Sequence, residues 1–414
     1  MQNSVTLNCR FCKTPLTHSF LDLGMSPVSN SYLRQEDLYQ KECFYPLHAF
    51  VCGECFLVQL AAFHAPDQLF SDYAYFSSYS ETWLKHAQAY VEYMIDRFGF
   101  DSGSQVVEIG SNDGYLLQYF KKRGVPVLGV EPAQNVAKVA QAANIPTMVK
   151  FFGLETAKGL VKEGVQADLI VANNVLAQAL DLNDFVQGMK TLLKPHGIVT
   201  IEVPHLVKLM EENQFDTIYH EHFSYFSFIT LQRVFAEHGL IIFDVEQLPT
   251  HGGSLRLYGR HANDEAKSIT TSVDDLRGGE LQAGLNLLET YAAFSPKVQE
   301  TKWHLVEFLI QVKREGKSIV GYGAPAKGNT LLNYCGIRSD FIDYTVDRSP
   351  HKQNHYLPGT HIPIYHPDRI KETRPDCLLI LPWNLKDEIM QQMQHIREWG
   401  GRFVVPIPKV EVYS

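Results

Sequence analysis

A strand, a glycine turn, a helix and a second strand follow one another between residues 106 and 131, and this order constrains the fold more than any other feature. The letters V-V-E-I-G-S-N-D-G-Y-L-L predict a strand at Val106–Ile109, a turn with Gly110 and Gly114, and then a helix. The next strand, P-V-L-G-V-E-P, ends at Glu131. Later segments repeat this alternation. It predicts an α/β fold with a Rossmann-like parallel sheet and ligands at the carboxyl ends of the strands.

The glycine turn also indicates what this sheet binds. It lacks the strict G-x-G-x-x-G of dinucleotide sites. It fits the looser acidic-x-G-x-x-x-G turn of S-adenosylmethionine sites, where the backbone approaches the amino-acid end of the cofactor. An acid about twenty residues further on commonly binds a ribose diol, and Glu131 has that place. The predicted cofactor-binding residues are Glu108, Gly110, Asn112, Asp113, Gly114, Glu131 and Asn173.

Four of the seven cysteines form two C-x-x-C pairs near the amino terminus. Two such pairs supply four thiolates, which suits a closed tetrahedral zinc site. A chance pair of pairs and a redox C-x-x-C are the alternatives, and a reducing compartment favours metal binding. We therefore predict a structural Zn²⁺ ion. Its ligands would be Cys9, Cys12, Cys52 and Cys55.

The segment F-D-T-I-Y-H-E-H-F-S-Y-F-S, residues 215–227, gathers acid and base groups in a loop after a predicted strand. Tyr219, His220, Glu221 and His222 place a phenol, a carboxylate and two imidazoles side by side. Imidazole titrates near neutral pH, and a neighbouring carboxylate can orient it or raise its pKa. The alternatives are a surface turn or a metal site, although the H-E-x-x-H spacing of helical zinc sites is absent. Because the loop follows a strand of the parallel sheet, we expect it at the edge where the cofactor binds.

A second α/β unit is predicted toward the carboxyl terminus. Helices at Leu276–Tyr291 and Lys297–Arg314 precede a strand S-I-V-G-Y-G and a loop A-P-A-K-G-N-T that opens another helix. The glycines around Lys327 suit a loop that holds a pyrophosphate at a helix amino terminus, and a purely structural turn is the alternative. The predicted domains are a zinc-binding module at 1–70, a cofactor-binding domain at 71–270 and a smaller Rossmann-like α/β domain at 271–414.

Charge and hydropathy limit the possible partners. The formal net charge of -9 and the pI near 6.0 argue against a nucleic-acid or anionic-membrane surface. No apolar run approaches the roughly 18 residues that span a bilayer. The first residues lack the basic and apolar regions of a secretion signal. We expect a cytoplasmic protein that is a monomer or a weak homo-oligomer.

Several motifs together resemble the sugar C-methyltransferases, and the resemblance covers nearly the whole chain. It rests on the two C-x-x-C pairs, Y-A-Y-F-S-S-Y-S, E-I-G-S-N-D-G, Y-H-E-H-F-S-Y-F-S, H-G-G-S-L-R and G-Y-G-A-P-A-K-G-N-T. The resemblance implies zinc binding and methyl transfer from S-adenosylmethionine to a ring carbon, usually C3, of a nucleotide-linked 4-keto-6-deoxysugar. Methylation of oxygen or nitrogen on a related sugar, and non-catalytic binding of a nucleotide-diphosphate sugar, are the alternative functions.

The resemblance also implies roles for single residues. His222 would be the base, with Tyr219 and Glu221 beside it, and Tyr79 would line the cofactor. Where the family commonly has histidine, this chain has Gln178, which hydrogen-bonds but does not titrate, so an amine or a hydroxyl at the reacting carbon stays open. For the aromatic strip at residues 70–83, a packing role and a ligand-facing lid are both open. The predicted substrate-binding residues are Tyr73, Gln178, His251, Arg256, Lys327 and Asn329.

Overall fold

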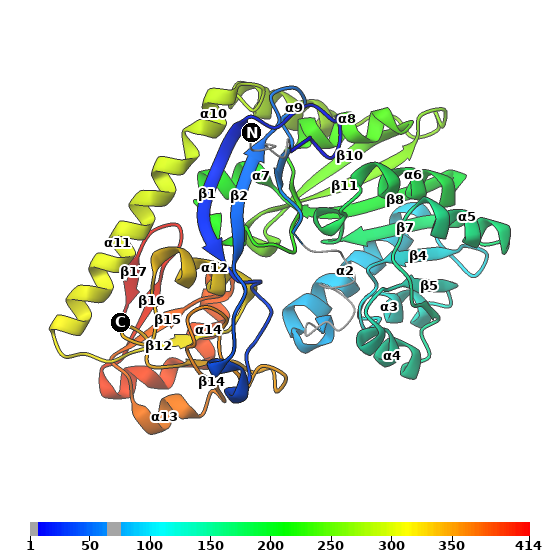
Figure 1. The fold of residues 1–414 in the computed structure, drawn as a ribbon. Helices are drawn as coiled ribbons and strands as arrows, with labels where there is room; N and C mark the ends of the chain where they lie inside the picture. Colours follow the sequence, from blue (N-terminus) through cyan, green and yellow to red (C-terminus); the bar gives the residue numbers. More distant parts are fainter. Residues whose placement is uncertain (1–6, 64–75) are drawn as a thin grey trace. The chain divides into compact units, whose positions relative to one another are not determined.

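The computed structural model describes residues 7–63 and 76–414 (Figure 1). Contacts divide the chain into two compact units. Of the described residues, the first unit combines 7–17, 52–63, 76–206 and 223–287, and the second combines 18–51, 207–222 and 288–414. The Tyr-His-Glu-His segment therefore belongs to the same unit as the carboxyl-terminal residues. In the sequence it lies between two stretches of the first unit.

A seven-stranded sheet forms the centre of the first unit. Its order is β10-β11-β8-β7-β4-β5-β6. The five strands from β4 to β8 are parallel, whereas β11 runs antiparallel to both β8 and β10. The parallel sheet predicted from the sequence is thus present, with an antiparallel pair at one edge. The strands are β4 (Val106–Ile109), β5 (Val127–Val130), β6 (Thr147–Met148), β7 (Ala167–Asn173), β8 (Leu193–Pro204), β10 (Leu240–Leu248) and β11 (Ser254–His261).

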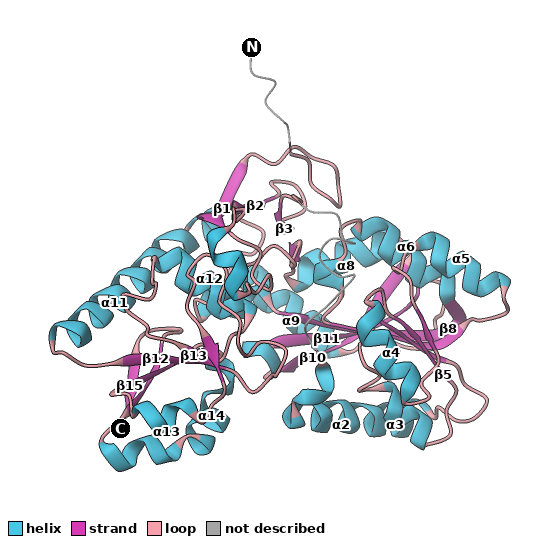
Figure 2. Cartoon of the chain, turned by 60° about the horizontal axis from the view of Figure 1, so that its bottom comes forward, coloured by secondary structure: helices cyan, strands magenta, loops and turns pink. Residues whose placement is uncertain are grey.

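Helices cover both faces of this sheet. Figure 2 shows α2 and α3 on one side and α5, α6 and α8 on the other. The apolar side chains of α2 and α3 pack in one buried cluster with the strands, and those of α5, α6 and α8 pack in a second. Serine side chains cap the amino termini of α2 and α8, where backbone N–H groups lack partners within the helix. The helices are α2 (Glu81–Phe98), α3 (Leu117–Lys122), α4 (Gln134–Ala142), α5 (Leu154–Lys162), α6 (Leu182–Leu192), α8 (Phe228–Glu237) and α9 (Thr271–Gln282).

Two short strands complete the first unit. Strand β3 (Val58–Leu60), just after the second C-x-x-C pair, pairs antiparallel with β9 (Ser224–Tyr225). Strand β9 begins two residues after His222. The segment that follows the Tyr-His-Glu-His motif is therefore fixed by main-chain pairing to the segment that follows the second cysteine pair.

The second unit has its own six-stranded sheet, of order β14-β13-β12-β15-β16-β17. All neighbours are parallel except β16 and β17. An antiparallel pair, β1 (His18–Ser26) with β2 (Tyr45–Val51), belongs to the same unit. The remaining strands are β12 (Ile319–Tyr322), β13 (Thr345–Val346), β14 (Ile364–Tyr365), β15 (Cys377–Ile380), β16 (Arg402–Val405) and β17 (Glu411–Tyr413). The helices are α7 (Leu206–Glu211), α10 (Leu288–Ala292), α11 (Phe294–Arg314), α12 (Ala326–Cys335), α13 (Arg369–Thr373) and α14 (Lys386–Gln392).

Two local predictions from the sequence are wrong. The helix predicted at Leu276–Tyr291 is interrupted, because α9 ends at Gln282 and Gly284 has a left-handed backbone with φ of 80°. The sequence L-P-T-H-G-G-S-L-R-L-Y also predicts a closing strand that carries His251 and Arg256, but His251 does not lie in a strand. It occupies a short turn before β11, with the left-handed φ of 55° that is uncommon outside glycine.

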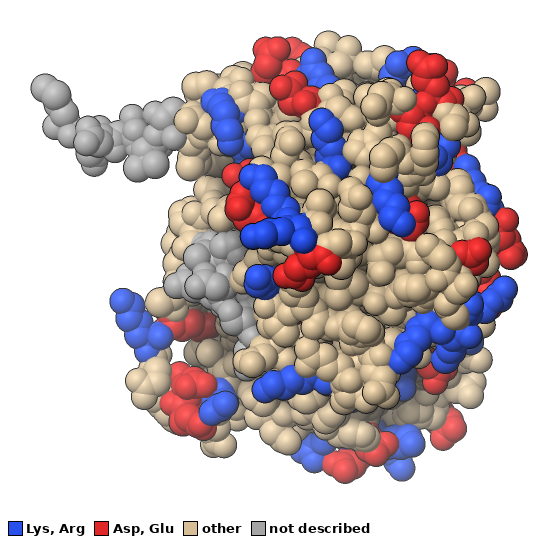
Figure 3. All heavy atoms as spheres, turned by 90° about the vertical axis from the view of Figure 1, so that its right-hand side faces the viewer, with Lys and Arg blue, Asp and Glu red and all other residues tan. Residues whose placement is uncertain are grey.

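The surface drawn in Figure 3 carries both signs of charge. Among the described residues on that face, Lys and Arg side chains lie beside Asp and Glu side chains, without a continuous field of one sign. Within residues 7–63 and 76–414, no helix combines the length and the apolar character needed to cross a membrane.

Candidate active site

Four cysteine thiols from the two C-x-x-C pairs converge in the first unit. The Sγ atoms of Cys9, Cys12, Cys52 and Cys55 lie within 4.8 Å of one another, and Cys9 and Cys55 are 3.5 Å apart. All four are free thiols and three are buried. Tetrahedral zinc with Zn–S distances of about 2.3 Å needs four sulfurs packed in this way. The residues therefore fit one closed zinc site, as predicted.

Arg10, between the first two cysteines, ties this zinc module to the sheet. Its guanidinium donates to the carbonyl oxygens of Leu180 at 2.9 Å and Leu60 at 2.5 Å. Its backbone N–H donates to Gln59 Oε1, and the Gln59 side chain contacts the Cys9 sulfur at 3.2 Å. The module is thus fixed to β3 and to the segment after β7, which contains Gln178.

The turn after β4 has the geometry that a cofactor requires. Gly110 and Gly114 have φ of 68° and 81°. A Cβ at either position would lie 3.0 Å from a neighbouring side chain, so only glycine suits this backbone. Glu131 accepts hydrogen bonds from the N–H groups of Asn112 and Ala133, both at 2.9 Å. Each carboxylate oxygen retains a second lone pair for a ribose hydroxyl.

Two other polar groups suit a ligand at this edge. The Asn173 Oδ1 atom, at the end of β7, and the Ser111 hydroxyl are buried without a hydrogen-bond partner among the described residues. Buried polar atoms are normally satisfied, so these two mark where a bound ligand would complete the site. Burial raises the pKa of Glu108 well above its usual value, and the carboxyls of Asp113 and Glu131 raise it further.

Three of the predicted cofactor residues have contacts within the protein. Asn112 Oδ1 and Asp113 Oδ2 accept hydrogen bonds from the backbone N–H groups of Ser77 and Ser78, at 2.8 and 3.0 Å. Tyr79 is 59% exposed and packs edge-on against Phe76. The predicted ligand Tyr73 lies outside the described residues.

Tyr219 and His222 form the central pair of the predicted acid–base segment. The tyrosine hydroxyl lies 2.9 Å from Nε2 of the imidazole, and the two rings are 4.1 Å apart. The other ring nitrogen, Nδ1, lies 3.3 Å from the carbonyl oxygen of Thr217. A base and a phenol thus share a hydrogen bond within one tight turn, closed by the His222 N–H on the Tyr219 carbonyl.

Glu221 is held by a different partner. Asn30 donates to its Oε1 at 3.0 Å, and its Oε2 is buried without a hydrogen-bond partner in residues 7–63 and 76–414. Burial raises the pKa of Glu221 to about 7. The carboxyl is therefore partly protonated at neutral pH, and its observed anchor is Asn30 rather than the imidazole of His222.

Two further contacts anchor the same segment to the second unit. Trp383 donates its indole N–H to Asp216 Oδ2 at 2.7 Å, and Thr330 donates its hydroxyl to the Ile218 carbonyl at 3.1 Å. Both partners are far away in the sequence, so sequence reasoning missed them. Trp383 lies just after β15, and this position after a strand is the one local signal that could have suggested it.

The first turn of α12, just after the loop that follows β12, holds Lys327 and Asn329. The Lys327 ammonium donates to Asn384 Oδ1 at 2.8 Å and lies 4.4 Å from the centre of the Trp383 ring. Burial lowers the pKa of Lys327 to about 8, and the carboxylate of Asp216 opposes that shift. Neither amide atom of Asn329 has a partner among the described residues, although the side chain is buried. The start of α12 therefore offers a cation and an unsatisfied amide.

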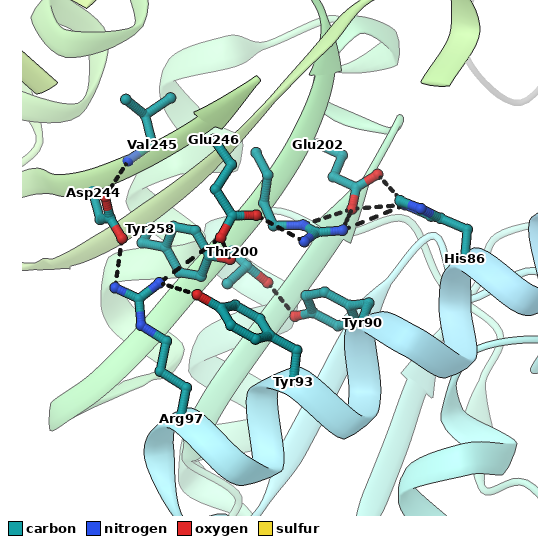
Figure 4. A network of polar contacts seen from close by, with 11 residues as sticks. His86, Tyr90, Tyr93, Arg97, Thr200, Glu202, Asp244, Val245, Glu246 and Tyr258 are labelled. Atoms are coloured by element: carbon teal, nitrogen blue, oxygen red, sulfur yellow. Dashed lines mark hydrogen bonds and ion pairs between the residues drawn. The ribbon is translucent and has the colours of Figure 1, made fainter. Parts of the chain in front are cut away.

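Arg256 belongs to a buried ion-pair network in the first unit. Figure 4 shows its partners Glu202 and Glu246. Its guanidinium binds Glu202 Oε1 at 2.6 Å and Glu246 Oε2 at 3.0 Å, and it is 6% exposed. His86 contacts the same Glu202 carboxylate at 2.9 Å. The structure places Arg256 in the attachment of α2 to β8 and β10, and its role with substrate stays a prediction. Gln178 is partly buried, at the end of a short turn after β7.

Models of known protein families match three successive parts of the chain. A model described as C-methyltransferase C-terminal domain matches residues 249–408, a zinc binding domain model matches 9–70, and a methyltransferase domain model matches 83–245. The C-methyltransferase NovU of Streptomyces niveus is 35% identical over 98% of this chain and 96% of its own length. The chain belongs to the C-methyltransferase family.

More distant similarities are confined to part of this C-methyltransferase. A ubiquinone biosynthesis O-methyltransferase of Bartonella tribocorum is 30% identical over 23% of this chain and 40% of its own length. The crystal structure of magnesium protoporphyrin IX methyltransferase from Synechocystis PCC 6803 has 12% identity and a TM-score of 0.32, and covers 42% of this chain and 78% of that one. The last similarity is too weak to carry an argument.

This C-methyltransferase uses S-adenosylmethionine as its cofactor and binds zinc. The turn after β4, Glu131 and Asn173 would hold the cofactor, and the four thiols would hold the metal. Because all four ligand positions of the zinc are filled by cysteine, that site stabilises the fold and leaves no open position for substrate.

Proposed function

We propose that this C-methyltransferase adds a methyl group to a ring carbon, C3, of a nucleotide-linked 4-keto-6-deoxysugar, with His222 as the base. The observation that supports this most is the Tyr219–His222 pair. A hydrogen on carbon beside a ketone is acidic enough to remove when a positioned base is available and the enolate oxygen is stabilised.

The contacts of His222 favour one tautomer. A carbonyl oxygen only accepts hydrogen bonds, so the contact of Nδ1 with Thr217 requires the proton on Nδ1. In the neutral ring, Nε2 then carries the lone pair, which accepts from the Tyr219 hydroxyl. The basic nitrogen is therefore the one that faces the phenol. For this nitrogen to remove a carbon-bound proton, the Tyr219 hydroxyl must turn away from it, and the electron pair of the broken C–H bond is then delocalised onto the ketone oxygen.

Two neighbours extend this acid–base group. The Tyr219 hydroxyl donates to Nε2, and when the base has taken a proton the same hydroxyl is free to donate to a developing oxyanion. Glu221, with a pKa near 7, is a second group that can carry a proton in this segment. When bound, S-adenosylmethionine supplies an electrophilic methyl group on its sulfonium, so a carbanion can be methylated without a metal.

The second unit supports the nucleotide-sugar part of the proposal. Helix α12 begins at the G-Y-G-A-P-A-K-G-N-T loop, where Gly323 has φ of 88° and a Cβ would lie 2.6 Å from Pro382. Backbone N–H groups at a helix amino terminus and a lysine ammonium suit a pyrophosphate. We assign Lys327 and Asn329 to the nucleotide diphosphate. The same unit holds Tyr219 to His222, so a sugar attached to that diphosphate would share a unit with the base.

The same proposal includes the cellular compartment and the partner of the enzyme. Nucleotide-linked deoxysugars are made in the cytoplasm, and the free thiols of the zinc site suit a reducing compartment. The partner is a soluble nucleotide-diphosphate sugar in deoxysugar biosynthesis, and the enzyme acts as a monomer or a weak homo-oligomer.

A screen of nucleotide-linked 4-keto sugars with methyl-labelled S-adenosylmethionine tests the assignment. The proposal predicts one labelled product whose methyl group is bonded to C3, as carbon–carbon coupling in the NMR spectrum would show. A label bonded to oxygen or nitrogen would contradict it and support the O- or N-methyltransferase alternative.

A further inference from the structure

The segment before α2, which belongs to the Y-A-Y-F-S-S-Y-S motif, is hydrogen-bonded to the cofactor turn. The N–H groups of Ser77 and Ser78 donate to the side chains of Asn112 and Asp113. The side chains of two residues in the cofactor turn thus accept hydrogen bonds from the segment that leads into α2. This arrangement places the first turns of α2 beside the turn that binds S-adenosylmethionine.

Trp83 lies in the first turn of α2 and is surrounded by aromatic rings. Its ring is stacked on Tyr115, the residue after Gly114, with centres 6.0 Å apart. It is also stacked on His86 at 4.9 Å and meets His251 edge-on at 5.1 Å. Trp83 remains partly exposed, whereas Tyr115 is 4% exposed. Trp83 is therefore in contact with three rings and is only partly buried.

His86 is itself fixed at the end of the sheet (Figure 4). Its Nε2 contacts both oxygens of Glu202, at 3.1 and 2.9 Å, and Glu202 also binds Arg256. Glu202 is adjacent to Asn173 in the pairing of β8 with β7. The contacts of Glu202 with His86 and Arg256 lower its pKa, so it is a carboxylate at neutral pH. The stack on Trp83 is thereby anchored at the carboxyl ends of β7 and β8.

The strand order indicates which end of the cofactor meets Trp83. The order β8-β7-β4-β5 puts Glu131, the predicted ribose ligand after β5, on one side of β4, and Glu202 on the other. A cofactor with its ribose at Glu131 and its amino-acid end at the turn after β4 extends from β5 toward β7. Its sulfonium end then approaches the side where Trp83 lies, and its adenine does not.

We propose that Trp83 forms an aromatic wall for the sulfonium of S-adenosylmethionine, and that His86 is a positioning residue that holds the indole in place. An indole face attracts a cation within about 6 Å of its centre, more strongly than phenylalanine does. S-adenosylhomocysteine, the product, lacks this charge. The wall would therefore bind the methyl donor more tightly than the spent cofactor, a preference that favours exchange of product for substrate.

The ratio of the two affinities separates this role from a structural one. Calorimetry on the whole chain should show that Trp83→Leu weakens S-adenosylmethionine about 3- to 30-fold more than S-adenosylhomocysteine. Trp83→Phe should reduce the preference for S-adenosylmethionine over S-adenosylhomocysteine less than Trp83→Leu does. His86→Ala should reduce this preference in part, because the indole is no longer held. Trp303→Leu, which changes a 57% exposed tryptophan on α11, is the matched control and should leave both affinities unchanged.

Fluorescence gives a second readout in a conservative variant. Titration with S-adenosylmethionine should change the tryptophan emission of the parent and of Trp303→Phe, and this change should be largely lost in Trp83→Phe. Equal losses for the two ligands in Trp83→Leu, or parent affinities in that variant, would overturn the proposal. The same emission change in Trp83→Phe as in the parent would also overturn the proposal. The Trp83→Phe variant keeps an aromatic ring in the stack, so it can be measured even if Trp83→Leu does not fold.

Discussion

The hydroxyl of Tyr219 lies 2.9 Å from Nε2 of His222, three residues further along the chain. This is the nitrogen that carries the lone pair once Nδ1 donates to the Thr217 carbonyl. In this arrangement Nε2 is the nitrogen that can accept a proton from the substrate, and the Tyr219 hydroxyl is the hydrogen-bond donor beside it. Carbon methylation requires such a base, whereas methylation of an amine does not depend on it to the same degree.

Zinc should stabilise the fold without taking part in the reaction. We expect one zinc per chain by metal analysis, because the four thiols form a single closed site. Cys52→Ser should lower the denaturant midpoint, and the fraction that stays folded should keep most of its activity. Cys43→Ser, at an exposed free thiol, is the control. Protein without zinc, with all four thiols open to rapid titration, would rule out the site.

Glu131 should contribute to cofactor affinity directly. Its carboxylate accepts from the N–H groups of Asn112, in the turn after β4, and Ala133, and keeps lone pairs for a ribose diol. Glu131→Ala should weaken S-adenosylmethionine binding by about 1.5–3 kcal/mol, the range for hydrogen bonds to charged groups. Glu155→Ala, on the exposed side of α5, should have no effect. Equal calorimetric affinities for parent and Glu131→Ala would place the ribose elsewhere.

Glu221 should make stability depend on pH in a defined window. Its pKa is raised by burial from 4.5 to about 7. Between these values the folded chain holds a proton that the unfolded chain has released. The free energy of unfolding should therefore fall as pH rises from about 4.5 to 7, by at most about 1.4 kcal/mol per pH unit, and then level off.

Glu221→Gln should flatten that part of the profile, because a neutral amide does not titrate. Glu36→Gln, whose side chain is 71% exposed, is the control and should keep the parent slope. Denaturant titrations at pH 5, 6 and 7 measure the difference. A parent-like slope in Glu221→Gln would mean that its carboxyl is ionised throughout.

Lys327 should act on the nucleotide sugar alone. Lys327→Met keeps the bulk of the side chain over Trp383 but removes the ammonium, so the Michaelis constant for the sugar nucleotide should rise about 10- to 150-fold. Cofactor affinity should stay at the parent value. Lys371→Ala, whose target is an exposed lysine of the same unit, is the control. If both ligands bind Lys327→Met as they bind the parent, the loop is only structural.

The features that the sequence predicted are local or repetitive. Gly110, Gly114 and Glu131 lie within one strand–turn–helix–strand unit, and the C-x-x-C spacing by itself indicates a pair of metal ligands. Tyr219 and His222 belong to a single turn, so their contact could be foreseen. The carboxyl of Glu221 could not be placed from its neighbours in the sequence, because its anchor comes from Asn30, 191 residues away.

Other contacts had no sequence signal for a related reason. The indole of Trp383 meets Asp216 across 167 residues, and a lone tryptophan after a strand does not reveal its acceptor. Arg256 was predicted to bind substrate, but its ion pairs with the carboxylates of Glu202 and Glu246 had no signal in the sequence. Which charges pair inside a protein is decided by tertiary contacts, and a single sequence does not contain them.

The most direct test is hydrogen exchange at the reacting carbon. In heavy water, with a nucleotide-linked 4-keto sugar and S-adenosylhomocysteine in place of the methyl donor, the parent should exchange the hydrogen at C3 for deuterium. His222→Asn keeps hydrogen-bonding atoms but cannot act as a base, so exchange and methylation should both fall about 10²–10⁴-fold. His304→Asn, whose target is 64% exposed on α11, should behave as the parent does. Methylation at the parent rate by His222→Asn would contradict the account.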